Sequence, residues 1–130
     1  MSKPIVRVII IDDDEDDFVI TSDVLSDSAD FEFDIFWIKN SNDGIYAIKN
    51  GLADLFILDY KIDNKNGIDI LREVQASEFT TPIIVVSGEN DEDVRSSALR
   101  CGASDVVWKS DLCEDLLLCL QNISFRKPFS

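Results

Sequence analysis

The stretch Val6-Arg7-Val8-Ile9-Ile10-Ile11-Asp12-Asp13 decides the fold that we expect for this chain. Five of the six residues from Val6 to Ile11 are β-branched, and such a run suits a strand that is buried on both faces of a sheet. The run stops abruptly at the two carboxylates of Asp12 and Asp13. In open parallel sheets, ligands bind beyond the carboxyl ends of the strands, so these acids are the first candidates for a functional site.

Apolar runs and helical stripes alternate along the rest of the chain. The expected strands are Val6–Ile11, Phe31–Ile38, Leu55–Leu58, Ile83–Val86 and Val106–Trp108. Between and after these strands we expect five helices. The first ends at about Ser26, and the second has Ser41 as its N-cap and an apolar stripe of Ile45, Ile48 and Leu52 that ends near Gly51. The third carries Ile70, Leu71 and Val74, the fourth carries Val94, Ala98 and Cys101 before a Gly102 C-cap, and the fifth runs from Asp111 to Phe125. The alternation predicts an α/β fold in a single domain, a doubly wound five-stranded parallel sheet with five helices. We expect this domain to span residues 1–125, with residues 126–130 as a tail or the start of a linker.

The composition excludes several classes of function. The chain has 130 residues, 26 acidic against 12 basic, and a net charge of −14. This charge argues against binding of nucleic acid or of an anionic membrane surface. The chain has no apolar run of the roughly 20 residues that span a bilayer and no recognisable signal peptide, so we expect a cytoplasmic protein. The absence of histidine excludes Ser-His-Asp and Cys-His catalysis and histidine-ligated zinc.

Cysteine gives no sign of a disulfide framework or of a metal site. The three cysteines, Cys101, Cys113 and Cys119, are odd in number and form no C-x-x-C pair. We expect them to be reduced thiols that pack as small apolar side chains.

Polar side chains stand at the ends of four of the expected strands. Asp12 and Asp13 end the first strand, Asp59 the third, Ser87 the fourth and Lys109 the fifth. Carboxylates that converge repel one another unless a cation lies among them, and Mg²⁺ is the common cation with oxygen ligands. A lysine beside such a cation is explained if a phosphoryl group also arrives, because phosphoryl transfer needs neutralised charge. Asp59 can then be the nucleophile that forms an aspartyl phosphate.

Four motifs together resemble the receiver domain of two-component response regulators. They are Val-Ile-Ile-Ile-Asp12-Asp13, Phe-Ile-Leu-Asp59-Tyr, Ile-Val-Val-Ser87-Gly88 and Gly102-Ala-Ser-Asp-Val-Val-Trp-Lys109. The resemblance implies a flavodoxin-like sheet of order 2-1-3-4-5 and a receiver domain over residues 1–125. It implies that Asp59 accepts the phosphoryl group, that Ser87 and Lys109 contact it, and that Asp12, Asp13, Asp59 and the backbone carbonyl of Lys61 hold Mg²⁺.

The resemblance also implies partners for the chain. The phosphoryl group would come from a histidine kinase or a histidine phosphotransfer protein in a two-component system or phosphorelay. Catalysis would be limited to self-phosphorylation from phosphodonors and autodephosphorylation. The last helix carries Leu116-Leu117-Leu118-Cys119-Leu120, which is apolar almost all round. We therefore expect the last two helices to contact a second copy or a downstream output domain.

Several positions depart from the usual pattern of the family. Ser110 replaces the proline that often follows the lysine, Val106 replaces a frequent aromatic residue, and Asp63 replaces a frequent proline. Lys61 and Glu89 stand where the family tunes dephosphorylation. These departures leave open the isomer of the Lys109–Ser110 peptide, the switching device and the lifetime of the phosphoryl group.

Two other functions remain open from the sequence. A degenerate receiver would act as a constitutive interaction domain without phosphorylation. A phosphatase with an Asp-x-Asp nucleophile could use Asp12 and Asp14, although Asp59 would then have no clear role. For the acids from Asp14 to Asp17 we favour a structural role over a functional one, because negative charge is favourable near the start of a helix. A calcium loop is rejected because Asp17 stands where that loop needs glycine.

Overall fold

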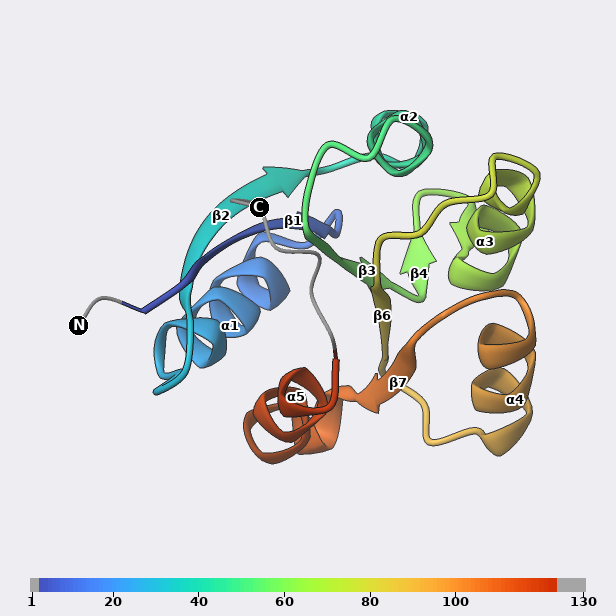
Figure 1. Ribbon diagram of the computed structural model, residues 1–130. Helices are drawn as coiled ribbons and strands as arrows, with labels where there is room; N and C mark the ends of the chain where they lie inside the picture. Colours follow the sequence, from blue (N-terminus) through green and yellow to red (C-terminus); the bar gives the residue numbers. More distant parts are fainter. Residues whose placement is uncertain (1–2, 124–130) are drawn as a thin grey trace.

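The computed structural model describes residues 3–123 and shows a parallel sheet with helices on both faces (Figure 1). The strands of the sheet are β1 (Ile5–Ile11), β2 (Glu32–Ile38), β3 (Leu55–Asp59), β6 (Ile83–Ser87) and β7 (Asp105–Trp108). The helices are α1 (Glu15–Ser26), α2 (Ser41–Lys49), α3 (Gly67–Gln75), α4 (Glu92–Arg100) and α5 (Leu112–Gln121). The strand order is β2-β1-β3-β6-β7. The predicted α/β fold, with its five parallel strands in the order 2-1-3-4-5, is confirmed.

The middle of the sheet is buried on both faces. Every residue of β3 and of β6 is buried, which agrees with their continuous apolar sequences. The edge strand β2 instead alternates exposed and half-buried residues over most of its length. β1 runs parallel to both β2 and β3, and Ile11 lies opposite Leu58 at the end of the strand. The carboxyl ends of β1 and β3 therefore meet at one edge of the sheet.

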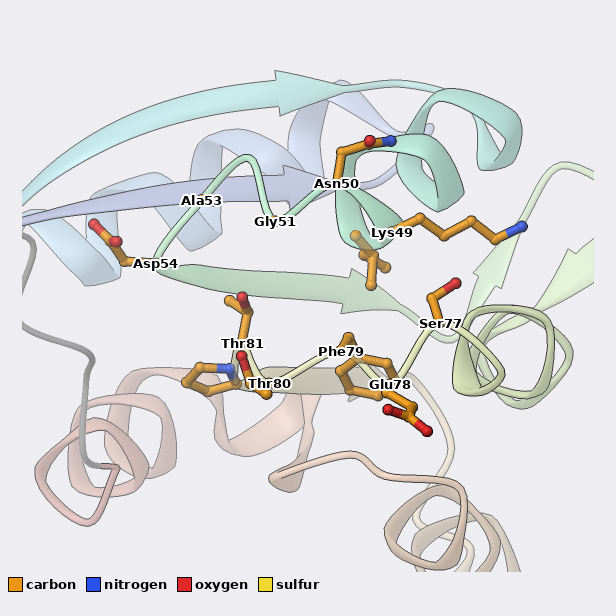
Figure 2. Close-up of a pocket in the computed structure, with 12 residues that line it drawn as sticks. Lys49, Asn50, Gly51, Ala53, Asp54, Ser77, Glu78, Phe79, Thr80 and Thr81 are labelled. Atoms are coloured by element: carbon orange, nitrogen blue, oxygen red, sulfur yellow. The ribbon is translucent and has the colours of Figure 1, made fainter.

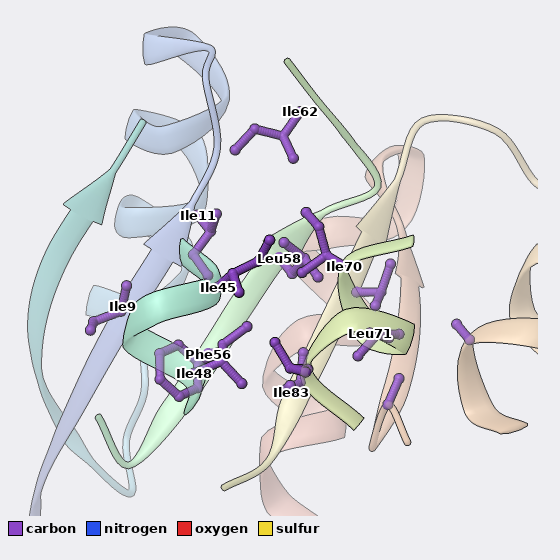
Figure 3. Close-up of a cluster of buried hydrophobic side chains, with 14 of the residues drawn as sticks. Ile9, Ile11, Ile45, Ile48, Phe56, Leu58, Ile62, Ile70, Leu71 and Ile83 are labelled. Atoms are coloured by element: carbon purple, nitrogen blue, oxygen red, sulfur yellow. The ribbon is translucent and has the colours of Figure 1, made fainter. Parts of the chain in front are cut away.

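Two apolar layers hold the helices to the sheet. On one face, α2, α3 and α4 cover a cluster that includes Ile45, Ile48, Ile70, Leu71 and Ala98 (Figure 3). On the other face, α1 and α5 supply Val24, Leu25, Leu116, Cys119 and Leu120. The period-3.6 stripes of these helices are the sequence signal that predicted them.

Helix α2 differs in detail from the prediction. Its N-cap is Asn40, whose side chain accepts the N–H of Asp43, and Ser41 is the first helical residue. Asparagine is as good a cap as serine, so the predicted Ser41 cap is wrong by one position. The helix ends at Lys49, before Gly51 with its φ of 59°. Leu52 is exposed beyond that end and does not belong to the predicted stripe.

The segment after β3 contains a small hairpin that the strands expected from the sequence do not include. Strands β4 (Lys61–Ile62) and β5 (Lys65–Asn66) pair antiparallel. Asp63 adopts a φ of 56° at its turn, a left-handed conformation that aspartate tolerates better than most residues. Ile62 is fully buried, so the hairpin is anchored to the core on one side.

The end of the chain differs from the prediction as well. α5 ends at Gln121 with Asn122 as its C-cap, short of the predicted Phe125. Phe125 and the expected tail of residues 126–130 lie outside the described residues. The Lys109–Ser110 peptide is trans, as are all peptide bonds in the described part of the chain. Over residues 3–123, no helix combines the length and the apolar character that crossing a membrane would need.

Candidate functional site

Three carboxylates and one ammonium converge at the carboxyl edge of the sheet. Carboxylate oxygens of Asp12, Asp17 and Asp59 all lie within 4.8 Å of one another. The Lys109 Nζ atom lies 2.7 Å from Asp17 Oδ2 and 3.3 Å from Asp59 Oδ1. Asp12 follows β1, Asp59 ends β3 and Lys109 follows β7, so three strand ends and the first turn of α1 build the cluster.

Burial makes the negative charges of this cluster costly. Asp12 and Asp59 are each only 5% exposed. Burial raises the pKa of Asp12 to about 7, helped by the charge of Asp59 and opposed by the hydrogen bond from the Asp14 N–H. Burial also raises the pKa of Asp59 above its ordinary value, although Lys109 opposes the shift. The cluster therefore carries more negative charge than its surroundings can stabilise.

Lys109 is the cation that partly balances the cluster. Burial alone would lower its pKa, but the hydrogen bond to Asp17 and the charge of Asp59 outweigh burial and raise it. The ammonium therefore stays charged at neutral pH. One positive charge remains against three carboxylates, which leaves a net negative site that favours a further cation.

The donor set itself fits a hard divalent cation. Three carboxylates with oxygens within 4.8 Å offer the oxygen ligands that Mg²⁺ and Mn²⁺ prefer. A cation between them would also offset the burial and the repulsion from Asp59 that together raise the pKa of Asp12. We conclude that the residues present are suited to hold such an ion.

Two of the predicted metal ligands, Asp13 and the Lys61 carbonyl, are not among these three clustered carboxylates. Asp13 is exposed, and its Oδ2 atom accepts the backbone N–H of Asp63 at 3.1 Å. It is not one of the three carboxylates that cluster. Lys61 belongs to β4, and its backbone N–H hydrogen bonds to Asp59, which lowers the pKa of that carboxyl. Its ammonium pairs with Glu89 at 3.1 Å.

Ser87 is the fourth predicted residue of the strand ends. It ends β6, and its neighbour Val86 lies opposite Asp59. Its buried hydroxyl donates to the Glu89 carbonyl at 3.2 Å and accepts the Glu89 N–H at 3.3 Å. The next residue is Gly88, where an added Cβ would lie 3.8 Å from Lys109 Cδ. Ser87 thus closes a tight turn beside the lysine.

Asp17 is the residue of the cluster that sequence reasoning missed. We assigned it to an ordinary helix start, and the structure corrects this because its carboxylate is the nearest partner of Lys109. Asp17 lies in the first turn of α1, which begins three residues after Asp12. A helix that starts directly beyond a strand end turns its first side chains back toward that end. The short interval between Asp12 and the helix was the available signal.

Two stacked aromatic residues hold the acidic loop, residues 12–14 between β1 and α1, in place. Trp37 Nε1 donates to the backbone carbonyl of Asp12 at 2.7 Å. The Trp37 ring stacks on Phe18, with centroids 4.5 Å apart and planes 8° from parallel. This contact fixes the end of β1 against α1, because Phe18 follows Asp17 directly. The sequence analysis placed Trp37 only in a strand.

A larger hollow lies at the opposite edge of the sheet. It measures about 650 Å³ and lies between the segment after α2 and the segment before β6 (Figure 2). Its charged side chains, Lys49, Asp54 and Glu78, point in different directions, and Asp54 already accepts the N–H of Arg7 at 2.9 Å. Because these three charged groups do not converge, the smaller cavity of about 100 Å³ beside Asp12, Asp17 and Lys109 is the better candidate.

Comparisons with known proteins agree with this fold. The Transcriptional regulatory protein CiaR of Streptococcus pneumoniae is 28% identical over 112 residues, which are 86% of this chain and 50% of CiaR. The chain thus spans about half the length of that relative.

Solved structures show the same fold. The phosphorylated cyanobacterial phytochrome response regulator RcpA superposes with a TM-score of 0.74 at 16% identity, covering 92% of this chain and 97% of that one. The Mn²⁺-bound form of response regulator Rcp1 gives a TM-score of 0.75 at 15% identity, covering 93% and 99%. Residues 8–120 match the response regulator receiver domain family. The chain therefore belongs to this family, whose members act in two-component signal transduction.

Proposed function

We propose that this domain is a phosphorylation-controlled switch that accepts a phosphoryl group on Asp59 with the help of Mg²⁺. The observation that carries the proposal is the position of Asp59, buried beside two further carboxylates and 3.3 Å from the Lys109 ammonium. A carboxylate in this setting can attack a phosphorus atom once a cation has neutralised the surrounding charge.

Mg²⁺ would be held by Asp59 and Asp12, with Asp13 and the Lys61 carbonyl as further ligands carried over from the family. The bound ion would neutralise charge on the incoming phosphoryl oxygens. That the structural neighbour Rcp1 was solved in a Mn²⁺-bound form supports the binding of a divalent cation by this fold. Asp17 is well placed to bind the same ion, directly or through water.

Lys109 and Ser87 would contact the phosphoryl group after transfer. In the structure Lys109 pairs with Asp17 and Asp59, and Ser87 bonds to its own turn. A phosphoryl group on Asp59 would add acceptor oxygens close to both side chains and draw them from these partners. The resulting shift of the turn after β6 and of the segment after β7 is the change that a partner would read.

The phosphoryl donor would be a histidine kinase or a histidine phosphotransfer protein, and the domain would work in the cytoplasm. The described part of this chain ends after α5, where Leu118 is exposed and Leu116, Cys119 and Leu120 are buried. Contact of the last two helices with a second copy or an output domain stays a prediction, and their exposed leucines are Leu99 of α4 and Leu118 of α5. Position 106 carries a valine, which is buried in the core, so switching at this position cannot use the rotation of an aromatic ring.

The intact mass of the protein after incubation with acetyl phosphate tests the proposal. We expect a gain of one phosphoryl group that requires Mg²⁺ and that is lost in Asp59→Asn. Asp34→Asn, which removes an exposed carboxylate of β2, is the matched control and should be phosphorylated like the wild type. No gain in a folded protein would favour the constitutive interaction domain instead.

A further inference from the structure

A chain of two hydrogen bonds links the acidic loop to the start of helix α2 through a single residue. The backbone N–H of Asp63 donates to Asp13 Oδ2 at 3.1 Å, and the carboxylate of Asp63 accepts the backbone N–H of Ser41 at 2.7 Å. These contacts span 50 and 22 residues along the chain. Asp63 is thus tied on one side to a predicted metal ligand and on the other side to a helix.

The conformation of Asp63 makes both bonds available. Its φ of 56° turns its N–H toward Asp13 while its side chain reaches α2. The neighbouring Ile62 is fully buried, and the Gly67 N–H donates to the Tyr60 carbonyl at the base of the hairpin. The hairpin that carries Asp63 is therefore anchored at its base and beside its turn.

Neither proline nor most other residues could do the same at position 63. Proline has no N–H to donate to Asp13, and its ring holds φ near −65°. Aspartate and asparagine tolerate a positive φ and also carry a side-chain acceptor. The negative charge of Asp63 is accommodated because its carboxylate faces the N-terminus of α2, where the helix dipole favours an anion.

Asp13 needs such support more than the other acids do. It is exposed, and it directly follows the acid Asp12 in the chain. Without a donor, repulsion would turn its carboxylate toward solvent. The Asp63 N–H engages Oδ2 only, which leaves Oδ1 free to bind a cation from a fixed direction. Partners of this kind orient metal ligands in many sites.

We infer that Asp63 is a positioning residue of the cation site, which holds Asp13 ready to bind Mg²⁺ and takes its own position from the Ser41 N–H. This inference rests on the proposed function, because it needs a cation among Asp12, Asp13 and Asp59. Residue 63 thereby couples occupancy of the cation site to the N-terminus of α2.

Two substitutions at Ser41 test the chain of bonds without touching any acid. Ser41 is the first residue of α2 and follows Asn40, which has φ −137° and ψ 158°. Proline fits this helix position and this preceding conformation, so Ser41→Pro removes the N–H that Asp63 accepts, together with the Ser41 hydroxyl. Ser41→Ala keeps that N–H and is its matched control. We expect Ser41→Pro to raise the Kd for Mg²⁺ about tenfold, and Ser41→Ala to stay within about twofold.

Two substitutions at Asp63 test the same bond from the other side. Asp63→Gly keeps the positive φ and loses the carboxylate, so it should raise the Kd for Mg²⁺ about tenfold. Asp63→Asn keeps an acceptor and should stay within about threefold of the wild type. Asp30→Ala removes an exposed acid from the loop before β2, at the opposite edge of the sheet, and controls for net charge.

Mg²⁺ titrations of the amide NMR spectrum give each Kd, and urea unfolding gives each stability. Weaker binding in Ser41→Pro and Asp63→Gly, with Asp63→Asn near the wild type, supports the inference. Equal or tighter binding in Ser41→Pro and Asp63→Gly overturns it, even if these variants are less stable. A wild-type protein that shows no Mg²⁺ response overturns the proposed function together with the inference. Normal wild-type binding with unaffected variants overturns the inference alone.

Discussion

The ammonium of Lys109 lies 2.7 Å from the carboxylate of Asp17, a residue 92 positions earlier in the chain. Both side chains are about one-third exposed. The pair joins the first turn of α1 to the end of β7 across the carboxyl edge of the sheet. It therefore holds Lys109 beside Asp59 before any phosphoryl group is present.

Replacing Lys109 should destabilise the metal-free protein in a pH-dependent way. Lys109→Met leaves Asp12, Asp17 and Asp59 without a cation, and we expect the free energy of unfolding to fall by about 2 kcal/mol at pH 8. At pH 5 the raised pKa of Asp12 lets it take up a proton, so the loss should be smaller. Urea unfolding in EDTA at both pH values measures this. An equal loss at pH 5 and pH 8 would show that Lys109 does not balance these carboxylates.

The stability of the wild-type protein should itself fall as pH rises. The pKa of Asp12 rises from its ordinary value of 3.8 to about 7 in the folded protein. Between these two pH values the folded protein therefore binds more protons than the unfolded chain. By linkage, the contribution of Asp12 is present below about pH 4 and is lost as pH rises through 7. Asp12→Asn should flatten this part of the profile, and Mg²⁺ should restore stability at pH 8. A profile that Asp12→Asn leaves unchanged would contradict the assignment.

The cysteines should differ sharply in their reactivity. Cys119 is buried, and burial together with the neighbouring Asp105 raises its pKa to about 12. Cys113 on the same helix is exposed. Iodoacetamide at pH 8 should therefore label Cys113 first and reach Cys119 only in urea, because the thiolate is the reactive form. Peptide mass spectrometry locates the label, and early labelling of Cys119 would argue against the packing of α5.

Gly44 allows helix α2 to approach β1 closely. A Cβ on this residue would lie 2.8 Å from Ile11 Cγ2, in the buried core. Alanine normally favours a helix over glycine by about 1 kcal/mol, but the clash should outweigh this gain. We expect Gly44→Ala to lower the free energy of unfolding by about 1–2 kcal/mol, measured in urea. A stabilised variant would mean that α2 can move away from Ile11.

The sheet and its helices could be predicted from the sequence because each strand is a short apolar run and each helix shows one apolar stripe. Leu55–Leu58 and Ile83–Val86 are buried at every position. Their continuous apolar sequences are short and show no helical spacing of apolar residues, so they indicated strands. The ends of helices were less predictable, since Asn40 and Ser41 are equally good caps. In the structure Asn40 is the N-cap, and the Ser41 N–H is therefore available to donate to Asp63.

The site could be predicted only as far as strand ends reveal it. Asp12, Asp59 and Lys109 follow buried strands, and the fold brings them together. Asp17 was missed because only the short interval between Asp12 and helix α1 pointed to it. Trp37 was missed because it lies within a strand, where the sequence pattern gives no sign of its contact with Asp12. The two hydrogen bonds of Asp63 depend on its positive φ in the β4–β5 hairpin. The polar sequence of this segment did not predict the hairpin.

The chemical identity of the phosphorylated residue tests the central claim most directly. Borohydride reduction of the protein after incubation with acetyl phosphate and Mg²⁺ converts an aspartyl phosphate to homoserine, which peptide mass spectrometry can locate. We predict homoserine at residue 59 alone, and none in samples without Mg²⁺. Homoserine at residue 12 would identify the Asp-x-Asp type of nucleophile instead, and its absence from every peptide of a folded, Mg²⁺-treated protein would contradict the account.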